Sequence, residues 1–124
     1  MTVLVDSDIL IEVSRGRDEK ILSRWVALSQ SETEILYSPV TAAELWAAAL
    51  PQEHEPLTRL FRALLCAPAD GETGRQAGEY LRKYRKSHSL ELGDALIAAA
   101  AVQSRAALWT RNRKHYPMKE VVFY

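Results

Sequence analysis

The sequence contains a single cysteine, Cys66, and no apolar run of the roughly 18 residues that a membrane-spanning helix needs. One cysteine excludes an intramolecular disulfide framework and a zinc site built from several cysteines, so we expect Cys66 to be a small buried hydrophobic residue. Neither charge is in excess, because sixteen Lys and Arg balance sixteen Asp and Glu. The N-terminus lacks the basic region of a secretory signal. These absences favour a soluble, cytoplasmic protein without a membrane partner.

The length of 124 residues predicts one domain over residues 1–124. Runs rich in β-branched residues at 2–5 and 121–123 are typical of buried strands, and residues 34–37 and 107–109 are weaker strand candidates. Helical patterns lie between the strands, at residues 18–29, 39–50, 56–65, 70–86 and 91–104. Strands that alternate with helices predict an α/β fold with a mostly parallel sheet covered on both faces.

Polar residues gather where the predicted strands end. In open parallel sheets, ligands bind outside the carboxyl ends of the strands. Oxygen ligands rich in carboxylates suit Mg²⁺ or Mn²⁺, and the sequence offers no set of His and Cys residues that zinc would prefer. The residues at this edge are Asp6 and Asp8 after the first strand, Glu44 in the helix after the second, Glu91 and Asp94 opening the last long helix, and Thr110, Arg111 and Asn112 after residues 107–109.

Several of these acids also have local explanations. Asp8 precedes the helical pattern 9–13 and is a candidate N-cap. Glu44 matches a capping box that begins at Thr41. Ser38 and the following proline are an alternative start for the same helix, and that start would leave Glu44 one turn inside it without a local partner. Glu91 is explained equally well by a favourable interaction with the helix dipole.

Asp94 is the strongest signal among the acids. Eight consecutive apolar residues follow it, so its carboxylate is expected to be half-buried, which is costly without a compensating partner. Glu91 lies three residues earlier on the same helical face, at a spacing where two like charges repel each other. A capping role near the helix N-terminus or a cation would offset the burial of Asp94, and a cation or a basic partner between the two carboxylates would relieve their repulsion.

Basic residues concentrate in two stretches. Residues 75–88 include Arg82 and Lys83, and residues 111–119 include Arg111, Arg113 and Lys114. Together with nearby aromatic and imidazole side chains, they could hold a nucleic-acid backbone while the acids hold a metal ion. A solvated helix face is the alternative explanation for the first stretch. The nearby aromatic and imidazole side chains are those of Tyr84, His115 and Tyr116. The simplest interpretation of His115 is a surface histidine.

Four segments together resemble a known family. VDSDILIE, VTAAELWAAAL, SLELGDALIAAAA and LWTRNRKHYP occur in this order and are similar to segments of PIN-domain ribonucleases, in particular toxins of the VapC type from bacterial toxin–antitoxin pairs. The resemblance covers nearly the whole chain. It implies a three-layer α/β/α PIN-like fold with a four- to five-stranded sheet, a divalent-metal site and cleavage of RNA. It also implies a homodimer and a cognate VapB-type antitoxin.

The resemblance also assigns residues by position. It places the four catalytic positions of the family on Asp6, Glu44, Asp94 and Asn112. The three acids are the implied ligands of Mg²⁺ or Mn²⁺, whereas Asn112 replaces an acid found in many relatives and supplies an amide oxygen without charge. That replacement weakens the case for a second metal ion. Accessory positions fall on Asp8, Glu91 and Thr110, and RNA contacts are expected from Arg82, Lys83, Arg111, Arg113 and Lys114.

Two other functions fit parts of the same sequence. The first strand and its two acids match the start of haloacid-dehalogenase-like phosphatases, with Asp6 as nucleophile, Asp8 as acid and base, and Gly93 and Asp94 resembling a later motif. The second acid of that motif is replaced by Ala98. The other alternative is a PIN-like module that binds RNA or protein without cutting, which the uncharged Asn112 would suit.

Overall fold

Four short parallel strands form the central sheet of the computed structural model, which describes residues 1–124. In spatial order they run β3, β2, β1 and β4, so β1 lies inside the sheet and the chain crosses over between neighbouring strands. The strand bounds are Thr2–Val5 for β1, Glu34–Tyr37 for β2, Leu65–Cys66 for β3 and Ala107–Trp109 for β4.

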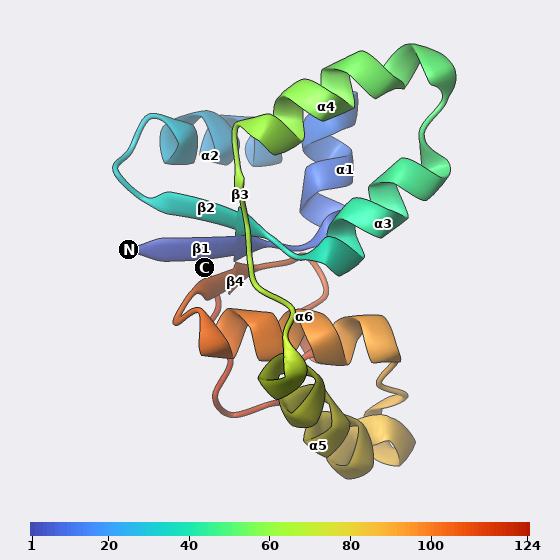
Figure 1. The fold of residues 1–124 in the computed structure, drawn as a ribbon. Coiled ribbons are helices and arrows are strands. Elements are labelled where there is room, and N and C mark those ends of the chain that lie inside the picture. The colour runs from blue at the N-terminus through green and yellow to red at the C-terminus, as the bar shows by residue number, and fades with distance from the viewer.

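Helices cover both faces of this sheet (Figure 1). Helices α1 to α4 lie on one face, and α5 and α6 lie on the other. This arrangement confirms the predicted three-layer α/β/α fold with a parallel sheet. The helix bounds are Ser7–Arg15 for α1, Glu19–Ser29 for α2, Pro39–Ala48 for α3, His54–Arg62 for α4, Gly71–His88 for α5 and Leu92–Gln103 for α6, with short 3₁₀ helices η1 at Pro51–Glu53 and η2 at Arg113–His115.

The central strand β1 is apolar after Thr2 because both faces of the sheet are buried there. Successive side chains of a strand point to opposite faces, so β1 supplies both cores. Val3 and Val5 belong to the core under α1–α4, whereas Leu4 packs in the core under α5 and α6. Leu108 and Trp109 of β4 divide in the same way. The sheet is therefore held by two separate apolar clusters.

Helix α6 is buried on nearly all sides, as its unbroken apolar run predicts. It lies between the sheet and α5, and its alanines allow close approach to both. The five buried alanines are Ala95, Ala98, Ala99, Ala100 and Ala101. An Asp at the start of so apolar a helix is thereby fixed at the carboxyl edge of the sheet. No helix in the structure combines the length and apolar character needed to cross a membrane.

Helix α3 begins at the second of its two predicted starts. Ser38 is the N-cap and accepts a hydrogen bond from the Val40 amide at 3.0 Å, and Pro39 occupies the first turn. The capping box from Thr41 does not form. Glu44 therefore lies inside α3, and its carboxylate is free to take part in tertiary contacts.

Three local predictions are wrong, all at the edges of the sheet. Cys66 is exposed rather than buried, because it belongs to β3, a two-residue edge strand that the sequence pattern does not reveal. Residues 121–123 form no strand, although Phe123 makes one parallel bridge to Leu108. Val122 is exposed, so this segment is not the buried run that its composition predicts.

Asp70 at the start of α5 gives the fold a pH-dependent contribution. Its Oδ1 accepts hydrogen bonds from the Thr73 amide and the Thr73 hydroxyl, both at 3.1 Å, and these bonds lower the pKa of Asp70 below its ordinary value. We predict that Asp70→Asn, which can still cap the helix but cannot ionise, lowers Tm at neutral pH.

The sign follows from the lowered pKa. The stabilisation is complete above the unfolded-state pKa of about 3.9 and is lost as the pH falls through the folded-state value. The difference in Tm between the wild type and Asp70→Asn should therefore close in acid, as thermal unfolding across this pH range can measure. A difference that stays constant with pH would contradict the prediction.

Candidate functional site

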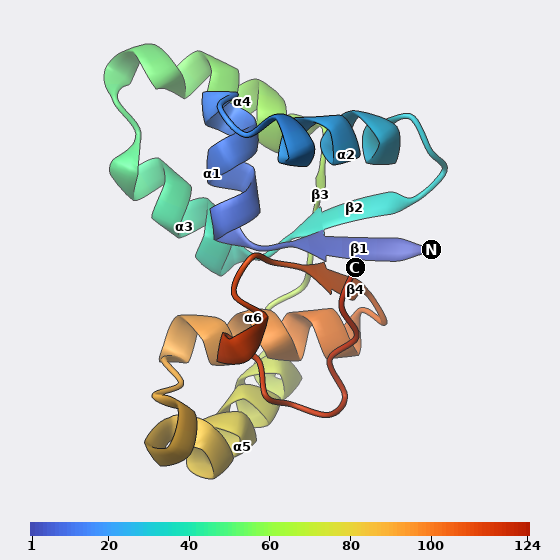
Figure 2. The same ribbon diagram turned by 180° about the vertical axis from the view of Figure 1, so that it is seen from behind.

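A pocket of about 250 Å³ lies where the strands end. The ends of β1 and β4 and the starts of α1, α3 and α6 meet at this edge, on the left in Figure 2. The pocket brings together six of the seven predicted catalytic and accessory residues, and the seventh, Thr110, is hydrogen-bonded to three of them. Its lining residues are Asp6, Ser7, Asp8, Ile11, Glu44, Glu91, Gly93, Asp94, Ile97, Asn112 and His115.

The carboxylate of Asp6 is buried and held from three sides. Its Oδ1 accepts a hydrogen bond from the Ser7 amide at 2.8 Å, which caps α1. Its Oδ2 accepts bonds from the hydroxyl of Thr110 at 2.9 Å and the phenol of Tyr116 at 2.8 Å. The side chain is only 7% exposed, so these bonds replace the water that an ionised carboxylate would otherwise bind.

Asp8 holds the loop after β4 and keeps one oxygen unpaired. Its Oδ2 accepts hydrogen bonds from the Arg111 amide at 3.0 Å and the Asn112 side-chain amide at 3.3 Å. Its Oδ1 is buried and has no hydrogen-bond partner. A buried carboxylate oxygen without a partner carries a desolvation cost that a bound cation would offset.

Glu44 reaches the pocket from α3, and Ser7 fixes its position. The Ser7 hydroxyl lies 2.8 Å from Glu44 Oε1 and 3.1 Å from the hydroxyl of Thr41, which is fully buried. This contact joins the start of α1 to the middle of α3. Burial of Glu44 by its apolar neighbours is therefore not what orients it.

Asp94 and Glu91 enter from the start of α6. Glu91 is the N-cap residue of α6, but its side chain makes no capping bond. Asp94 Oδ2 lies 3.9 Å from His115 Nδ1 of η2, so an imidazolium there would be its nearest cationic partner. The expected surface histidine thus lies at the pocket rim, with half of its side chain exposed.

Two acids of the pocket, Asp8 and Asp94, have raised pKa values. Burial is the largest cause for both Asp8 and Asp94, and the charge of Asp6 is the second. Glu91 and Glu44 raise the pKa of Asp94 further, whereas His115 lowers it. Burial and the adjacent Asp6 also raise the pKa of Tyr116, which keeps its phenol protonated as a donor. The pocket is consequently a region of negative potential that favours a cation.

The donor atoms of the pocket suit a hard divalent cation. They are carboxylate and amide oxygens, and Mg²⁺ typically takes one or two carboxylates while keeping several waters. No group of three or more His, Cys, Asp or Glu side chains forms a preorganised metal site. Both oxygens of Asp6 and one of Glu44 already accept hydrogen bonds within the protein. The residues therefore fit a hydrated ion better than a fully enclosed one.

The predicted RNA-binding residues lie outside the pocket. Arg111 faces Glu12 and Asp18, at 3.8 and 3.7 Å, and Arg113 donates a hydrogen bond to the carbonyl oxygen of Tyr124 at 3.2 Å. Lys114 is exposed in η2, and Arg82 and Lys83 lie on α5. The two arginines after β4 are thus engaged by the protein itself.

Sequence reasoning misses the residues that orient the acids. Tyr116 is expected beside RNA, but it is buried, and it binds Asp6 because η2 turns the chain back toward the end of β1. Ser7 lies between Asp6 and Asp8 in the first motif. This position of a hydroxyl between two acids is the one local signal of its role in the pocket.

Comparison with known proteins decides the family. The model of the PIN domain family matches residues 3–121. The chain belongs to the PIN domain family. Ribonuclease VapC10 of Mycobacterium tuberculosis is 37% identical to it over 95% of this chain and 88% of the relative. Ribonuclease VapC19 of the same species is 31% identical over 93% of this chain and 92% of the relative.

Solved structures agree on the fold of this PIN domain. VapBC2 from Rickettsia felis, bound to a DNA fragment from its promoter, gives a TM-score of 0.82 at 17% identity and covers 100% of this chain and 98% of that one. VapBC-1 from nontypeable Haemophilus influenzae gives 0.80 at 20% identity, covering 100% and 97%. The resemblance to VapC-type PIN domains is confirmed, and the phosphatase alternative loses its support.

The bond from Tyr116 to Asp6 can be tested directly. We predict that Tyr116→Phe lowers the free energy of unfolding by about 1.5–3 kcal/mol, the range for a bond to a charged group. The ring and its packing are retained, so the loss reports the hydroxyl. Tyr124→Phe is the matched control, because the Tyr124 hydroxyl makes no hydrogen bond. Denaturant titration measures both variants, and equal stabilities would contradict the assigned role.

Proposed function

We propose that this PIN domain is a toxin endoribonuclease that hydrolyses RNA phosphodiester bonds with a bound Mg²⁺ or Mn²⁺ ion and is neutralised by a VapB-type antitoxin. The observation that carries the proposal is the pocket in which Asp6, Asp8, Glu44 and Asp94 converge, with a buried oxygen of Asp8 left unpaired. Similarity to VapC ribonucleases along nearly the whole chain supports the activity.

Asp6, Glu44 and Asp94 are the proposed ligands, and Asn112 supplies an uncharged oxygen beside them. When bound, the ion would polarise the phosphate and lower the pKa of an attacking water. Three carboxylates suffice to balance one divalent charge, so a single ion is the simplest stoichiometry. Cleavage by water would give a 5′-phosphate and a 3′-hydroxyl without use of the 2′-hydroxyl.

The surrounding residues hold this ligand set in place. Thr110 and Tyr116 donate hydrogen bonds to Oδ2 of Asp6, which fixes its rotamer. Ser7 positions Glu44, and Asp8 positions Asn112 through the loop amides. Such supporting contacts orient metal ligands and keep them available. The non-catalytic alternative gives no reason for so many acids to be held together at a cost in stability.

Loss of a ligand should abolish cleavage. We predict that Asp94→Asn lowers the rate of RNA cleavage by at least about 100-fold, because loss of even a supporting contact at a metal site costs 10- to 100-fold. Glu55→Gln on the exposed side of α4 removes one carboxylate elsewhere and should cleave as the wild type does. End-mapped cleavage of a defined RNA with Mg²⁺ or Mn²⁺ is the assay. Activity in excess EDTA, or in a protein with both Asp6→Ala and Asp94→Ala, would defeat the proposal.

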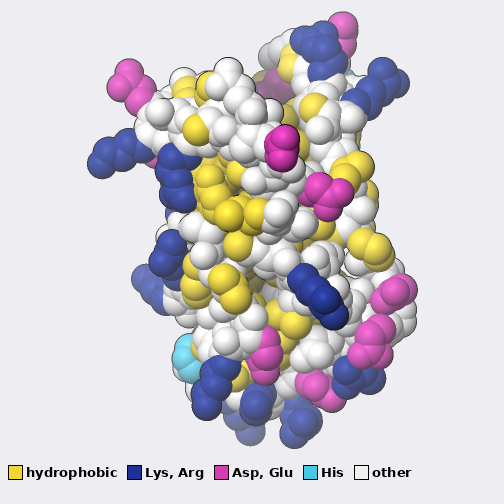
Figure 3. Space-filling model, turned by 90° about the vertical axis from the view of Figure 1, so that its left-hand side faces the viewer, with side chains coloured by type: hydrophobic (Ala, Val, Ile, Leu, Met, Phe, Trp, Pro, Cys, Tyr) yellow, Lys and Arg dark blue, Asp and Glu magenta, His cyan; other side chains and the backbone are white.

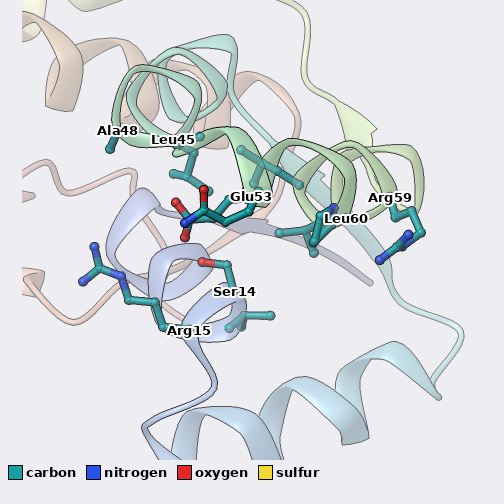
Figure 4. A pocket seen from close by; sticks show the side chains of 12 residues that line it. Ser14, Arg15, Leu45, Ala48, Glu53, Arg59 and Leu60 are labelled. Atoms are coloured by element: carbon teal, nitrogen blue, oxygen red, sulfur yellow. The ribbon is translucent and has the colours of Figure 1, made fainter.

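A groove with apolar walls, nearer the C-terminal ends of α1 and α3 than the acid pocket, is the proposed binding site of the antitoxin. It encloses about 470 Å³ between α1, α3, η1 and α4, and Figure 4 shows side chains from these elements facing one another across it. Leu45, Leu57 and Leu60 contribute apolar surface, and Arg15 and Arg59 lie at its rim. An amphipathic helix fits such a groove.

Helices α1 and α3 connect the groove with the acids. Leu45 lines the groove, whereas the preceding Glu44 lines the acid pocket. An antitoxin segment that leaves the groove along α3 could therefore place an Arg or Lys against the carboxylates. A basic side chain there would occupy the place of the metal, since the pocket favours positive charge.

A bulky charge in the groove should block the antitoxin without stopping cleavage. We predict that Ala48→Arg weakens binding of the small protein encoded beside this gene by at least about tenfold, because a cation is buried against an apolar helix. Ala47→Arg is the matched control, since Ala47 is also exposed on α3 but does not line the groove. Titration calorimetry reads the affinity. Equal affinities for the two variants would place the antitoxin elsewhere.

The proposal also includes formation of a homodimer and action in the cytoplasm. The residues proposed to contact RNA are Arg82, Lys83, Arg111, Arg113 and Lys114.

A further inference from the structure

A second hollow adjoins the acid pocket at the junction of α5 and α6. It encloses about 390 Å³ and is lined by His88, Ser89, Glu91, Asp94 and His115. Three of these residues, Glu91, Asp94 and His115, also line the acid pocket. The two spaces therefore adjoin at these three residues, and His88 and Ser89 line the second hollow alone.

Helix α5 leads into this hollow with unpaired positive charge. None of the four cations in its C-terminal half makes an ion pair, whereas Arg75 near its start pairs with Glu72 and Glu79. Figure 3 shows Lys and Arg side chains gathered at the lower end of the molecule, at the level of α5. The four unpaired residues are Arg82, Lys83, Arg85 and Lys86.

An aromatic platform lies on the same part of α5. The rings of Tyr84 and His88 meet edge to face, with centroids 5.7 Å apart at 82°. Lys83 Nζ lies 6.0 Å from the Tyr84 ring, and the Ser87 hydroxyl lies 2.7 Å from His88 Nδ1. His88 is exposed, so its ring is open to a stacked base. Tyr84 is half-buried against the core and holds the His88 ring in place. Basic residues beside an exposed ring are a combination that binds single-stranded nucleic acid.

The other basic segment is less available. Arg111 faces two acids and Arg113 is bonded to the carbonyl of Tyr124, so neither is free to bind a phosphate without losing those contacts. An acidic pocket repels RNA unless cations nearby attract the backbone. Lys114 is unpaired beside His115, and the four unpaired cations of α5 lie on the helix whose last residue, His88, lines the hollow.

We propose that the hollow at His88 is a subsite for the RNA strand next to the cleaved phosphate. The strand leaves the acid pocket, a base stacks on the exposed ring of His88, which the half-buried Tyr84 supports edge to face, and the backbone continues along Arg82, Lys83, Arg85 and Lys86. This proposal rests on the proposed ribonuclease function and adds the path of the substrate. It also assigns recognition to single-stranded RNA, because a base paired in a duplex cannot stack on the platform.

The test is binding of a fluorescent single-stranded RNA of about 12 nucleotides, measured by anisotropy in EDTA so that it is not cut. His88→Ala and Tyr84→Ala should each weaken Kd by on the order of tenfold, the lower part of the range for a lost stacking contact. His54→Ala is the matched control, because His54 also packs edge to face on an aromatic ring, that of Trp46, on the other side of the sheet. It should bind as the wild type does.

Salt dependence separates the backbone contacts from the stacking. Lys83→Ala combined with Lys86→Ala should lower the slope of log K against log salt by roughly 0.7 for each residue, as for single-stranded nucleic acid. Lys20→Ala on α2 should leave the slope unchanged. His88→Ala should weaken binding with the slope unchanged, since the proposed role of this ring is stacking on a base rather than contact with a phosphate.

The outcomes distinguish this proposal from the proposed function. Unchanged affinity in His88→Ala and Tyr84→Ala overturns the subsite even where the wild type cleaves RNA. If these variants sediment differently from the wild type but bind RNA with unchanged affinity, the subsite is also overturned. The surface is then assigned to a protein partner. A wild type that cleaves neither RNA nor bis(p-nitrophenyl) phosphate with Mg²⁺ or Mn²⁺ overturns the proposed function, whatever the binding results.

Discussion

The carboxylate of Asp6 is the point on which the rest of the site depends. It receives hydrogen bonds from the start of α1, the end of β4 and the residue after η2, so three segments far apart in the chain meet on two oxygen atoms. Its own amide donates to the Trp109 carbonyl at 2.9 Å, which extends the pairing of β1 with β4. A charged acceptor in a buried position forms stronger hydrogen bonds than a neutral one. The same carboxylate also raises the pKa of Asp8 and Asp94, so the group that organises the pocket creates its electrostatic strain.

The two layers of helices contribute different residues and surfaces around this pocket. The α1–α4 layer contributes Glu44 and, beside it, the apolar groove assigned to the antitoxin. The α5–α6 layer contributes Asp94, Glu91 and the hollow that leads to the basic part of α5. In the proposed arrangement, inhibitor and substrate would approach the same acids from opposite faces of the sheet. The pocket has an excess of negative charge. It could be balanced by a metal ion, by a basic side chain of a partner or by the imidazole of His115.

Particular residues show how far sequence patterns reach. The acid after a short apolar strand and the acid ahead of eight apolar residues both mark where a parallel sheet opens, so the pattern alone assigns Asp6 and Asp94 to one edge. Local capping rules could not settle Glu44, because two helix starts satisfied them and only packing favoured Ser38. Arg111 and Arg113 resemble free cations by composition. Their partners, Glu12, Asp18 and the carbonyl of Tyr124, are too distant in sequence for a local pattern to reveal.

Local sequence patterns predict the alternation of strands and helices, the buried character of α6 and the acidic edge of the sheet. Each of these depends on the spacing of apolar and charged residues within one segment. Tertiary contacts, in contrast, set which carboxylate oxygens accept hydrogen bonds within the protein and which have no partner. Tyr116 became a buried donor, Cys66 became exposed on an edge strand, and the cations of α5 remained unpaired beside the pocket. These outcomes depend on which segments meet in space. The free energy of such contacts is a property of pairs of residues, and it is not carried by either residue alone.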